Sequence, residues 1–127
     1  MEPWPHEFVS SAGRLLQIRG RRDRSGGYAV LEFIFTGRAL RLSCNVDTDE
    51  IVVEPHETAT PGLDDVSADD LLGQGIGKVI EYAWWMSNHR GYQDAFQMRL
   101  LDLDDRSEAT RQFEAAASVV WVRTVTG

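Results

Sequence analysis

The sequence has little of the chemistry on which most metalloproteins and disulfide-bonded proteins depend. It contains one cysteine and three histidines in 127 residues, so an intramolecular disulfide is excluded, and a zinc signature of several converging ligands is absent. A lone thiol is typical of a reducing compartment. No apolar run approaches the roughly 20 residues of a membrane span, and the first residues lack a basic region followed by an apolar one. We therefore expect a cytoplasmic protein that binds no membrane.

Basic residues are missing from the middle of the chain. The formal net charge is −7, and residues 45–75 contain nine acids and no Lys or Arg, whereas residues 1–44 contain seven Arg and four acids. An acidic protein repels phosphate at long range, which argues against nucleic acid as a partner. A basic protein partner fits better, although acidity can also serve only solubility. The candidate partner-binding residues are Asp47, Asp49, Glu50, Asp64, Asp65, Asp69 and Asp70.

Residues 77–103 contain two apolar runs around a polar turn and predict a β-hairpin. From Asp94 to Asp102 the apolar residues recur with period two, as in a half-buried strand. In the connection, Gly91 can adopt positive φ and Asn88 can bond its own backbone. Residues 79–86 also fit a helical stripe, but their aromatic and β-branched content favours a strand. Because Trp84 and Trp85 would point to opposite faces, we expect this strand to lie centrally in the sheet.

The front half predicts further antiparallel strands. Residues 1–12 contain prolines on both sides of Trp4 and are expected to form a tail or a docking arm. Residues 13–55 predict a first meander, with strands over residues 14–19, 28–35, 39–46 and 51–54, the last ended by Pro55.

Residues 56–75 predict an acidic linker with one short helix. Ser67 would cap a helical turn over residues 67–72, which Gly73 would end. Residues 76–127 then predict a second meander. Its end is ambiguous, because residues 107–117 have high helix propensity while residues 113–121 alternate. We favour one long strand over residues 112–125, preceded by at most one helical turn.

A short internal similarity supports two related halves. Gly13-Arg-Leu-Leu-Gln-Ile leads to Gly27-Tyr28, and Gly77-Lys-Val-Ile-Glu-Tyr leads to Gly91-Tyr92, at an offset of 64 residues. The sequence therefore predicts a single α+β domain over residues 1–127. It would consist mainly of antiparallel β meanders in two similar halves, related by a pseudo-twofold, with one short helix between them.

The glycine-rich run from Gly73 to Lys78 does not match a nucleotide-binding motif. A phosphate-binding loop requires Ser or Thr where Val79 stands and Gly where Leu72 stands. A dinucleotide fingerprint requires Gly where Lys78 stands. Glycines that leave a helical turn to enter a strand explain the run.

Metal ligands and nucleophiles are not gathered either. Ile51 occupies a position at which the Asp47–Asp49 spacing would need a calcium ligand. Cys44 falls on the same strand face as Leu42, so we expect a buried core residue and no nucleophile. The sequence predicts no cofactor and no metal.

One polar cluster could form a site. Asn88, His89, Arg90, Tyr92 and Asp94 follow the predicted turn and its exit, where they could bind a polar ligand or a partner, or where His89 could act as a base oriented by Asp94. Alternatively these residues only shape the turn.

The segment Trp84-x-x-x-Asn88-x-x-Gly91-Tyr92-x-Asp94 resembles the central part of small uncharacterised bacterial domain families of unknown function. The layout, which is small, acidic and mostly β, also resembles that of immunity proteins that neutralise interbacterial toxins. The resemblance implies a bacterial origin and assigns no catalytic role to any residue.

The expected function is that of a non-catalytic protein-binding domain. Its most concrete form is a toxin-neutralising immunity protein whose acidic surface meets a basic toxin. The alternative is a small enzyme or ligand-binding domain with a polar site at Asn88, His89, Tyr92 and Asp94. A structural dimer through a sheet edge or the Trp4 arm is a third possibility.

Overall fold

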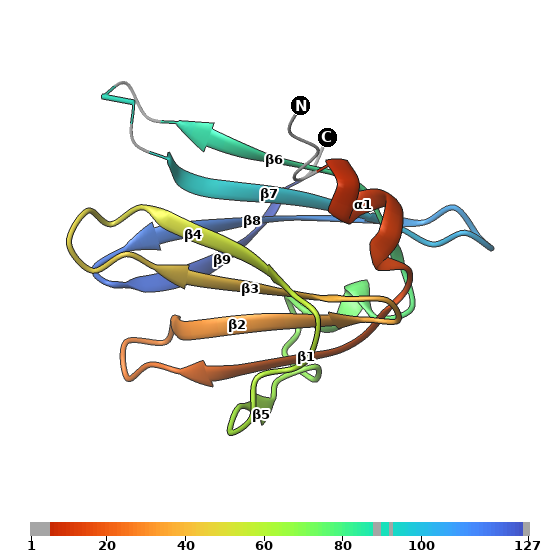
Figure 1. Cartoon of the computed structure of the whole chain (residues 1–127), viewed down its shortest axis with the longest axis horizontal. Coiled ribbons are helices and arrows are strands. Elements are labelled where there is room, and N and C mark those ends of the chain that lie inside the picture. Colours follow the sequence, from red (N-terminus) through yellow and green to blue (C-terminus); the bar gives the residue numbers. More distant parts are fainter. Residues whose placement is uncertain (1–5, 88–89, 92, 126–127) are drawn as a thin grey trace.

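The computed structural model describes residues 6–87, 90–91 and 93–125. One α-helix and a series of antiparallel strands make up this part of the chain (Figure 1). The elements are α1 (His6–Ala12), β1 (Leu15–Arg22), β2 (Tyr28–Phe35), β3 (Ala39–Cys44), β4 (Ile51–His56), β5 (Asp64–Asp65), the 3-10 turn η1 (Gly73–Gly75), β6 (Val79–Ser87), β7 (Gln93–Leu101), β8 (Glu108–Ala116) and β9 (Val119–Val125).

The strands form one curled, mostly antiparallel sheet. The strand order is β4-β3-β2-β9-β8-β7-β6. Strand β1 lies off this path and pairs with both β2 and β5. Strands β1 to β4 pair consecutively, as do β6 to β9, and the pair Tyr28 and Val120 joins the two runs. The sheet bends into a half-barrel, which confirms a mainly antiparallel fold with a short helix (Figure 1).

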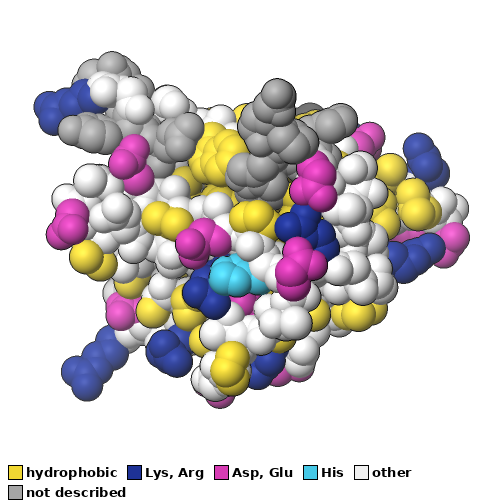
Figure 2. All heavy atoms as spheres, viewed as in Figure 1, with side chains coloured by type: hydrophobic (Ala, Val, Ile, Leu, Met, Phe, Trp, Pro, Cys, Tyr) yellow, Lys and Arg dark blue, Asp and Glu magenta, His cyan; other side chains and the backbone are white. Residues whose placement is uncertain are grey.

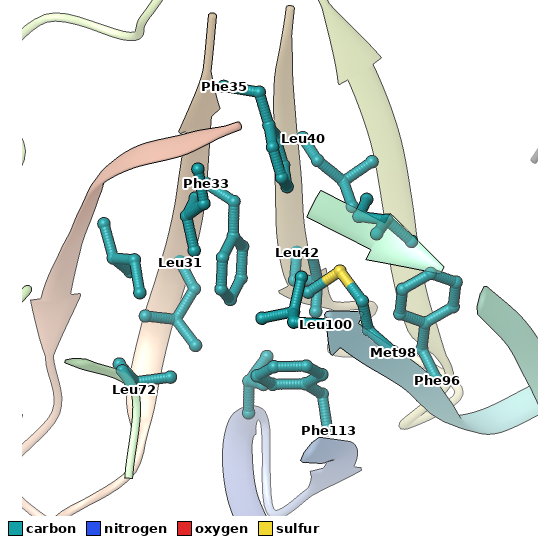
Figure 3. Packing of buried hydrophobic residues seen from close by; sticks show 14 of the residues in the cluster. Leu31, Phe33, Phe35, Leu40, Leu42, Leu72, Phe96, Met98, Leu100 and Phe113 are labelled. Carbon is teal, nitrogen blue, oxygen red and sulfur yellow. The ribbon is translucent and has the colours of Figure 1, made fainter. Parts of the chain in front are cut away.

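The core fills the inside of this half-barrel. Phe33 of β2 and Phe113 of β8 pack edge to face, with ring centroids 5.4 Å apart. Phe96 and Met98 of β7 are fully buried beside them, and all four side chains converge in Figure 3. Alternate residues of each strand point inward, so the period-two pattern of the sequence builds one shared core.

The predicted hairpin is confirmed, but the prediction that its first strand lies centrally in the sheet was wrong. Strands β6 and β7 pair antiparallel, with Trp84 opposite Gln97 and Trp85 opposite Phe96. Strand β6 lies at the end of the strand path and not at its centre. Only the Trp85 side chain packs against the core, because the sheet is covered on one face there and Trp84 lies on the other face.

The prediction of a tail or arm over residues 1–12 was wrong for residues 6–12. These residues form α1, in which Phe8 and Ala12 are almost completely buried. Phe8 packs edge to face on Phe35 at 5.8 Å. Residues four apart lie on the same face of a helix, so Phe8 and Ala12 together form the face of α1 that packs against the sheet. Trp4 lies outside the described residues.

The helix predicted between the two halves was also misplaced. Residues 67–72 form turns followed by η1, and the α-helix stands at the start of the described chain. The Ser67 hydroxyl accepts a hydrogen bond from the Ile18 N–H at 2.8 Å, so it ties this segment to β1. Asp69 instead accepts from the Leu71 N–H and holds the turn.

The single strand predicted over residues 112–125 is two strands. The chain reverses at Ala117 and Ser118, whose φ values are 53° and 68°. Two consecutive residues with positive φ are typical of a tight hairpin turn, which Asn and Gly usually form. Neither Asn nor Gly stands at this turn, so the alternation of the sequence continues through it without a turn signal. Pro55 does not end its strand either, because β4 is an edge strand and pairs Pro55 with Leu40.

Similarity of the two halves is not confirmed. Gly13 and Gly77 both adopt positive φ, and the backbone of Leu15 exchanges hydrogen bonds with Lys78 and Gly77. However, β3 and β4 have six residues each, whereas β8 has nine and β9 has seven. Strand β5 of the linker also pairs with β1 of the first half, and among the described residues it pairs with no strand of the second half.

Candidate functional site

The predicted polar cluster is only partly visible. Asn88, His89 and Tyr92 lie outside the described residues, so their grouping stays a prediction. Arg90 is exposed, and Asp94 is half-buried near the start of β7.

Asp94 lines an open hollow of about 360 Å³ at one end of β6, β7 and β8. Small and apolar residues make up much of the wall, and oxygen-bearing side chains make up the rest. The lining residues are Met86, Ser87, Asp94, Ala95, Gln112, Glu114, Ala115 and Ala116.

The two carboxylates of the hollow have different surroundings. Glu114 Oε1 pairs with Arg123 Nε at 2.8 Å, and its Oε2 accepts a hydrogen bond from Gln112 Nε2 at 2.6 Å. Within the described part of the chain, no residue donates a hydrogen bond to the Asp94 carboxylate. The hollow thus has one carboxylate already satisfied and one open to a donor.

A face rich in aromatic residues adjoins the hollow. Along β6 to β9, every second residue points away from the core, because Trp85, Phe96, Phe113 and Val120 point into it. We call this surface the outer aromatic face, and it comprises Tyr82, Trp84, Met86, Gln97, Arg99, Gln112, Glu114, Trp121 and Arg123. Paired positions on neighbouring strands place these side chains in rows across the sheet.

Aromatic stacking organises one edge of this face. The rings of Tyr82 and Trp84 stack with centroids 4.8 Å apart and an interplanar angle of 29°. The Arg99 guanidinium lies 5.5 Å from the Tyr82 centroid and donates to the Tyr82 hydroxyl at 2.9 Å. Tyr82 is 40% exposed and Trp84 is half-buried, so part of this stacked pair on an edge strand reaches solvent.

The charges around this face are mainly acidic. Arg99 pairs with Glu81 at 2.9 Å and also with Glu108. The hydrogen bond to Glu108 raises the pKa of Arg99 above its ordinary value, and the Tyr82 hydroxyl adds to this. When the flanking Glu81, Glu108 and Asp94 are counted with Glu114, the groups named on and around this face are four carboxylates and two guanidinium groups, a balance of −2.

The predicted partner-binding acids form two separate groups. Asp47, Asp49 and Glu50 lie in the connection between β3 and β4. Asp64 and Asp65 form β5, which pairs with β1, and Asp69 and Asp70 lie in the segment that follows β5 (Figure 1). On the face drawn in Figure 2, acidic and basic side chains are interspersed and do not form one acidic area.

Several of these acids hold the chain's own backbone. Asp49 accepts a hydrogen bond from the Ser118 N–H at 3.1 Å and so joins two turns. Asp65 accepts from Gln17 at 2.9 Å and from the Ser67 N–H at 2.8 Å, and these bonds lower its pKa to about 2.

The Asp69 side chain connects the segment after β5 to strands β1 and β2. Its carboxylate accepts the Tyr28 hydroxyl at 2.5 Å and Arg22 at 2.7 Å. Burial, together with the bond to Asp69, raises the pKa of Tyr28 well above its ordinary value. Asp47, Asp64 and Asp70 are exposed.

Cys44 is half-buried and lies 3.5 Å from an Asp49 carboxylate oxygen. Burial, followed by this neighbour, raises the pKa of its thiol to about 11, which suppresses the nucleophilic thiolate. Among the described residues no group of three or more His, Cys, Asp or Glu side chains could hold a metal ion. The described helix is not long and apolar enough to cross a membrane.

Comparison with known proteins decides the family. Residues 12–127 match a family of unknown function (DUF6334). The chain belongs to this family. The predicted resemblance to a small domain family of unknown function is thereby confirmed, and the match assigns no activity. Comparisons with curated proteins and with solved structures gave no significant match.

The sequence of this DUF6334 chain did not predict the outer aromatic face as a candidate functional surface. Tyr82, Trp84 and Met86 alternate with Ala83 and Trp85, so the sequence does contain the signal of a strand with two different faces. Large side chains on both faces of a strand predict that both faces are buried. In the structure the core packs against the Ala83 and Trp85 side of β6, and Tyr82 and Trp84 lie on the opposite face.

Proposed function

We propose that the chain is a non-catalytic protein-binding domain that recognises a basic partner through its outer aromatic face. The observation that carries this proposal is the stacked pair of Tyr82 and Trp84 on the solvent side of an edge strand. Aromatic residues, Met and Arg are enriched at the centres of protein interfaces, and this face combines all three.

The chemistry of the face favours a basic partner. Lys and Arg side chains bind favourably over Trp and Tyr rings, at about 0.5–2 kcal/mol for each contact. Glu81 and Glu108 beside Arg99 leave an excess of negative charge, which attracts cations and speeds their association.

Variants of the face test this proposal. Tyr82→Ala and Trp84→Ala remove the two stacked rings of the face. Leu103→Ala is the matched control, because Leu103 is 47% exposed on the loop after β7. Chemical cross-linking in the source organism, followed by mass spectrometry, would identify the partner. We expect a basic protein that the two face variants lose and the control retains. Equal retention by all variants would refute the proposal.

The more specific form of the proposal is a toxin-neutralising immunity protein, in which the exposed acids guide a basic toxin toward the chain. Asp47→Lys, Asp64→Lys and Asp70→Lys together reverse charge without touching the internal bonds of Asp65 and Asp69. We expect this triple variant to slow association more at low salt than at high salt. The partner should also arrest growth when expressed alone and lose that effect when co-expressed with this chain.

A second candidate is a small enzyme or ligand-binding domain with a polar site at Asn88, His89, Tyr92 and Asp94. The hollow beside Asp94 is the observation that favours it. In that case Asp94→Asn would abolish the binding of a small metabolite and leave protein binding unchanged. Thermal-shift screening of metabolites against the wild type and Asp94→Asn separates the two candidates.

A further inference from the structure

We infer that the hollow beside Asp94 and Glu114 receives one arginine side chain of the partner. The inference rests on the proposed function and names what the chain recognises at the edge of the outer aromatic face. Three features of the hollow support it: the chemistry of its polar groups, its apolar wall, and its continuity with the face.

The polar groups that line the hollow are mainly acceptors. Asp94, Glu114, the Gln112 carbonyl and the Ser87 hydroxyl supply oxygen atoms, and no Lys, Arg or His is among the described lining residues. A ligand must therefore bring hydrogen-bond donors and positive charge. A guanidinium carries five N–H donors in a planar fork that matches carboxylates, whereas an ammonium is a compact point charge.

One carboxylate of the hollow already binds a guanidinium group of the chain itself. Glu114 binds the Arg123 guanidinium through Nε at 2.8 Å while Gln112 orients the other carboxylate oxygen. Asp94 lies next to the residue that pairs with Glu114, because Ala95 is opposite Glu114 in the sheet. A second guanidinium would therefore find at Asp94 a carboxylate that no described residue occupies.

The rest of the wall suits the aliphatic stem of an arginine. Met86, Ala95, Ala115 and Ala116 line the hollow with carbon, and long basic side chains lay their methylene groups along such surfaces. The volume of about 360 Å³ is near the lower end of the roughly 300–1,000 Å³ of small-molecule sites. It suits one side chain better than a large cofactor.

The hollow continues directly into the outer aromatic face, because Met86, Gln112 and Glu114 belong to both. An extended segment lying across the face could thus place one arginine in the hollow while its other side chains contact Tyr82 and Trp84. Carboxylates outnumber guanidinium groups in the hollow and around the face, so the same basic partner is favoured along the whole path.

Short peptides test the inference without the partner. The probe is the acetylated and amidated peptide Ala-Ala-Arg-Ala-Ala, followed by amide chemical shifts in NMR spectra of the full chain. We expect saturable shifts at Ala95, Ala115 and Ala116. The same peptide with citrulline, an uncharged isostere of arginine, should not saturate. Agmatine, a free guanidino amine, should bind more weakly than the arginine peptide.

Two variants locate the binding. Asp94→Asn should weaken the arginine peptide about threefold, the effect of one partly screened ion pair. Ala116→Leu should fill the exposed rim of the hollow and block the peptide sterically. Asp104→Asn is the control, since Asp104 is an exposed acid on the β7–β8 turn and should leave affinity unchanged. Dispersed spectra of each variant establish that it is folded.

The outcomes separate this inference from the proposed function. Equal binding of the citrulline peptide, tighter binding of agmatine, or unchanged affinity in both hollow variants would overturn the inference. If the arginine peptide binds as expected but no basic protein depends on Tyr82 and Trp84, the proposed function fails and the hollow's specificity for guanidinium stands.

Discussion

Glu32 accepts hydrogen bonds from both the backbone N–H and the hydroxyl of Thr60, at 2.7 and 2.6 Å. Glu32 is completely buried on β2, and Arg41 lies 3.5 Å from its carboxylate. A buried carboxylate is stable in a protein only when charge and donors surround it. This contact fastens the segment between β4 and β5 across the outside of the first strands.

Removal of the Glu32 charge should therefore destabilise the fold. We expect Glu32→Gln to lower the free energy of unfolding by about 1.5–3 kcal/mol, because its amide group cannot accept both Thr60 hydrogen bonds. Urea denaturation followed by tryptophan fluorescence measures this change. Glu54→Gln, on the exposed surface of β4, should alter stability by less than about 0.5 kcal/mol. Similar losses in both variants would contradict the assigned role.

The contact between Phe33 and Phe113 should couple the two strand runs. We expect Phe113→Ala to reduce the free energy of unfolding by about 3–5 kcal/mol through loss of burial and formation of a cavity. A double-mutant cycle of Phe33→Leu and Phe113→Leu should give a coupling energy of about 0.5–1.5 kcal/mol from the edge-to-face contact. Strictly additive effects in the cycle would show that the two rings act independently.

The β8–β9 turn should become more stable with glycine. Ser118 has a φ of 68°, which is unfavourable for a residue with a Cβ atom. Ser118→Gly retains the N–H that Asp49 accepts and should raise the free energy of unfolding by about 0.5–1 kcal/mol. Ala116→Gly, in the extended end of β8, is the control and should lower it. Thermal denaturation of both variants distinguishes turn strain from a general effect of glycine.

Asp65 should contribute a pH-dependent part of the stability. Its pKa in the folded chain is about 2, compared with an ordinary value of 3.8. Because the folded value is depressed, the contribution is fully present above pH of about 4 and is lost as the pH falls toward about 2. The difference in melting temperature between the wild type and Asp65→Asn should shrink over this interval. A difference that is constant from pH 6 to about pH 2 would contradict the role of the Asp65 carboxylate.

Cys44 should react slowly with alkylating reagents. A thiol pKa of about 11, raised from 9.0, reduces the thiolate population at pH 8 by about a hundredfold. Asp49→Asn removes the neighbouring charge and should accelerate the reaction with iodoacetamide, followed by mass spectrometry. The chain unfolded in urea provides the reference rate of an accessible cysteine. A native rate equal to that reference would show that burial and Asp49 do not protect the thiol.

Much of the fold follows from local patterns. The strand over residues 28–35 was predicted with the bounds that the structure has, because its apolar alternation is bordered by turn residues on both sides. The hairpin of β6 and β7 was also predicted, since Gly91 and the period-two residues of the second arm act within a short segment. The fold prediction was wrong where the local sequence does not indicate a turn. An example is the β8–β9 turn, which Ala117 and Ser118 form without glycine.

Less of the candidate site followed from the sequence. Asp94 was predicted and lines the hollow, but Glu114 and Gln112 come from β8 and Met86 comes from β6. The acids selected by composition proved to be divided between two groups, and Asp49, Asp65 and Asp69 mainly hold the chain's own loops. The net charge of a segment does not show where its acidic side chains lie in the fold. The register of the strands determines which side chains are neighbours.

The sequence by itself determined the antiparallel strands, the hairpin after Val79 and the lack of a disulfide, because these depend on neighbouring residues and on composition. Only the tertiary structure decided that β6 is an edge, that Trp84 and Tyr82 face away from the core, and that residues 6–12 form a docked helix. The physical reason is that burial of a side chain depends on what the rest of the chain packs against it. That packing involves residues far apart in the sequence.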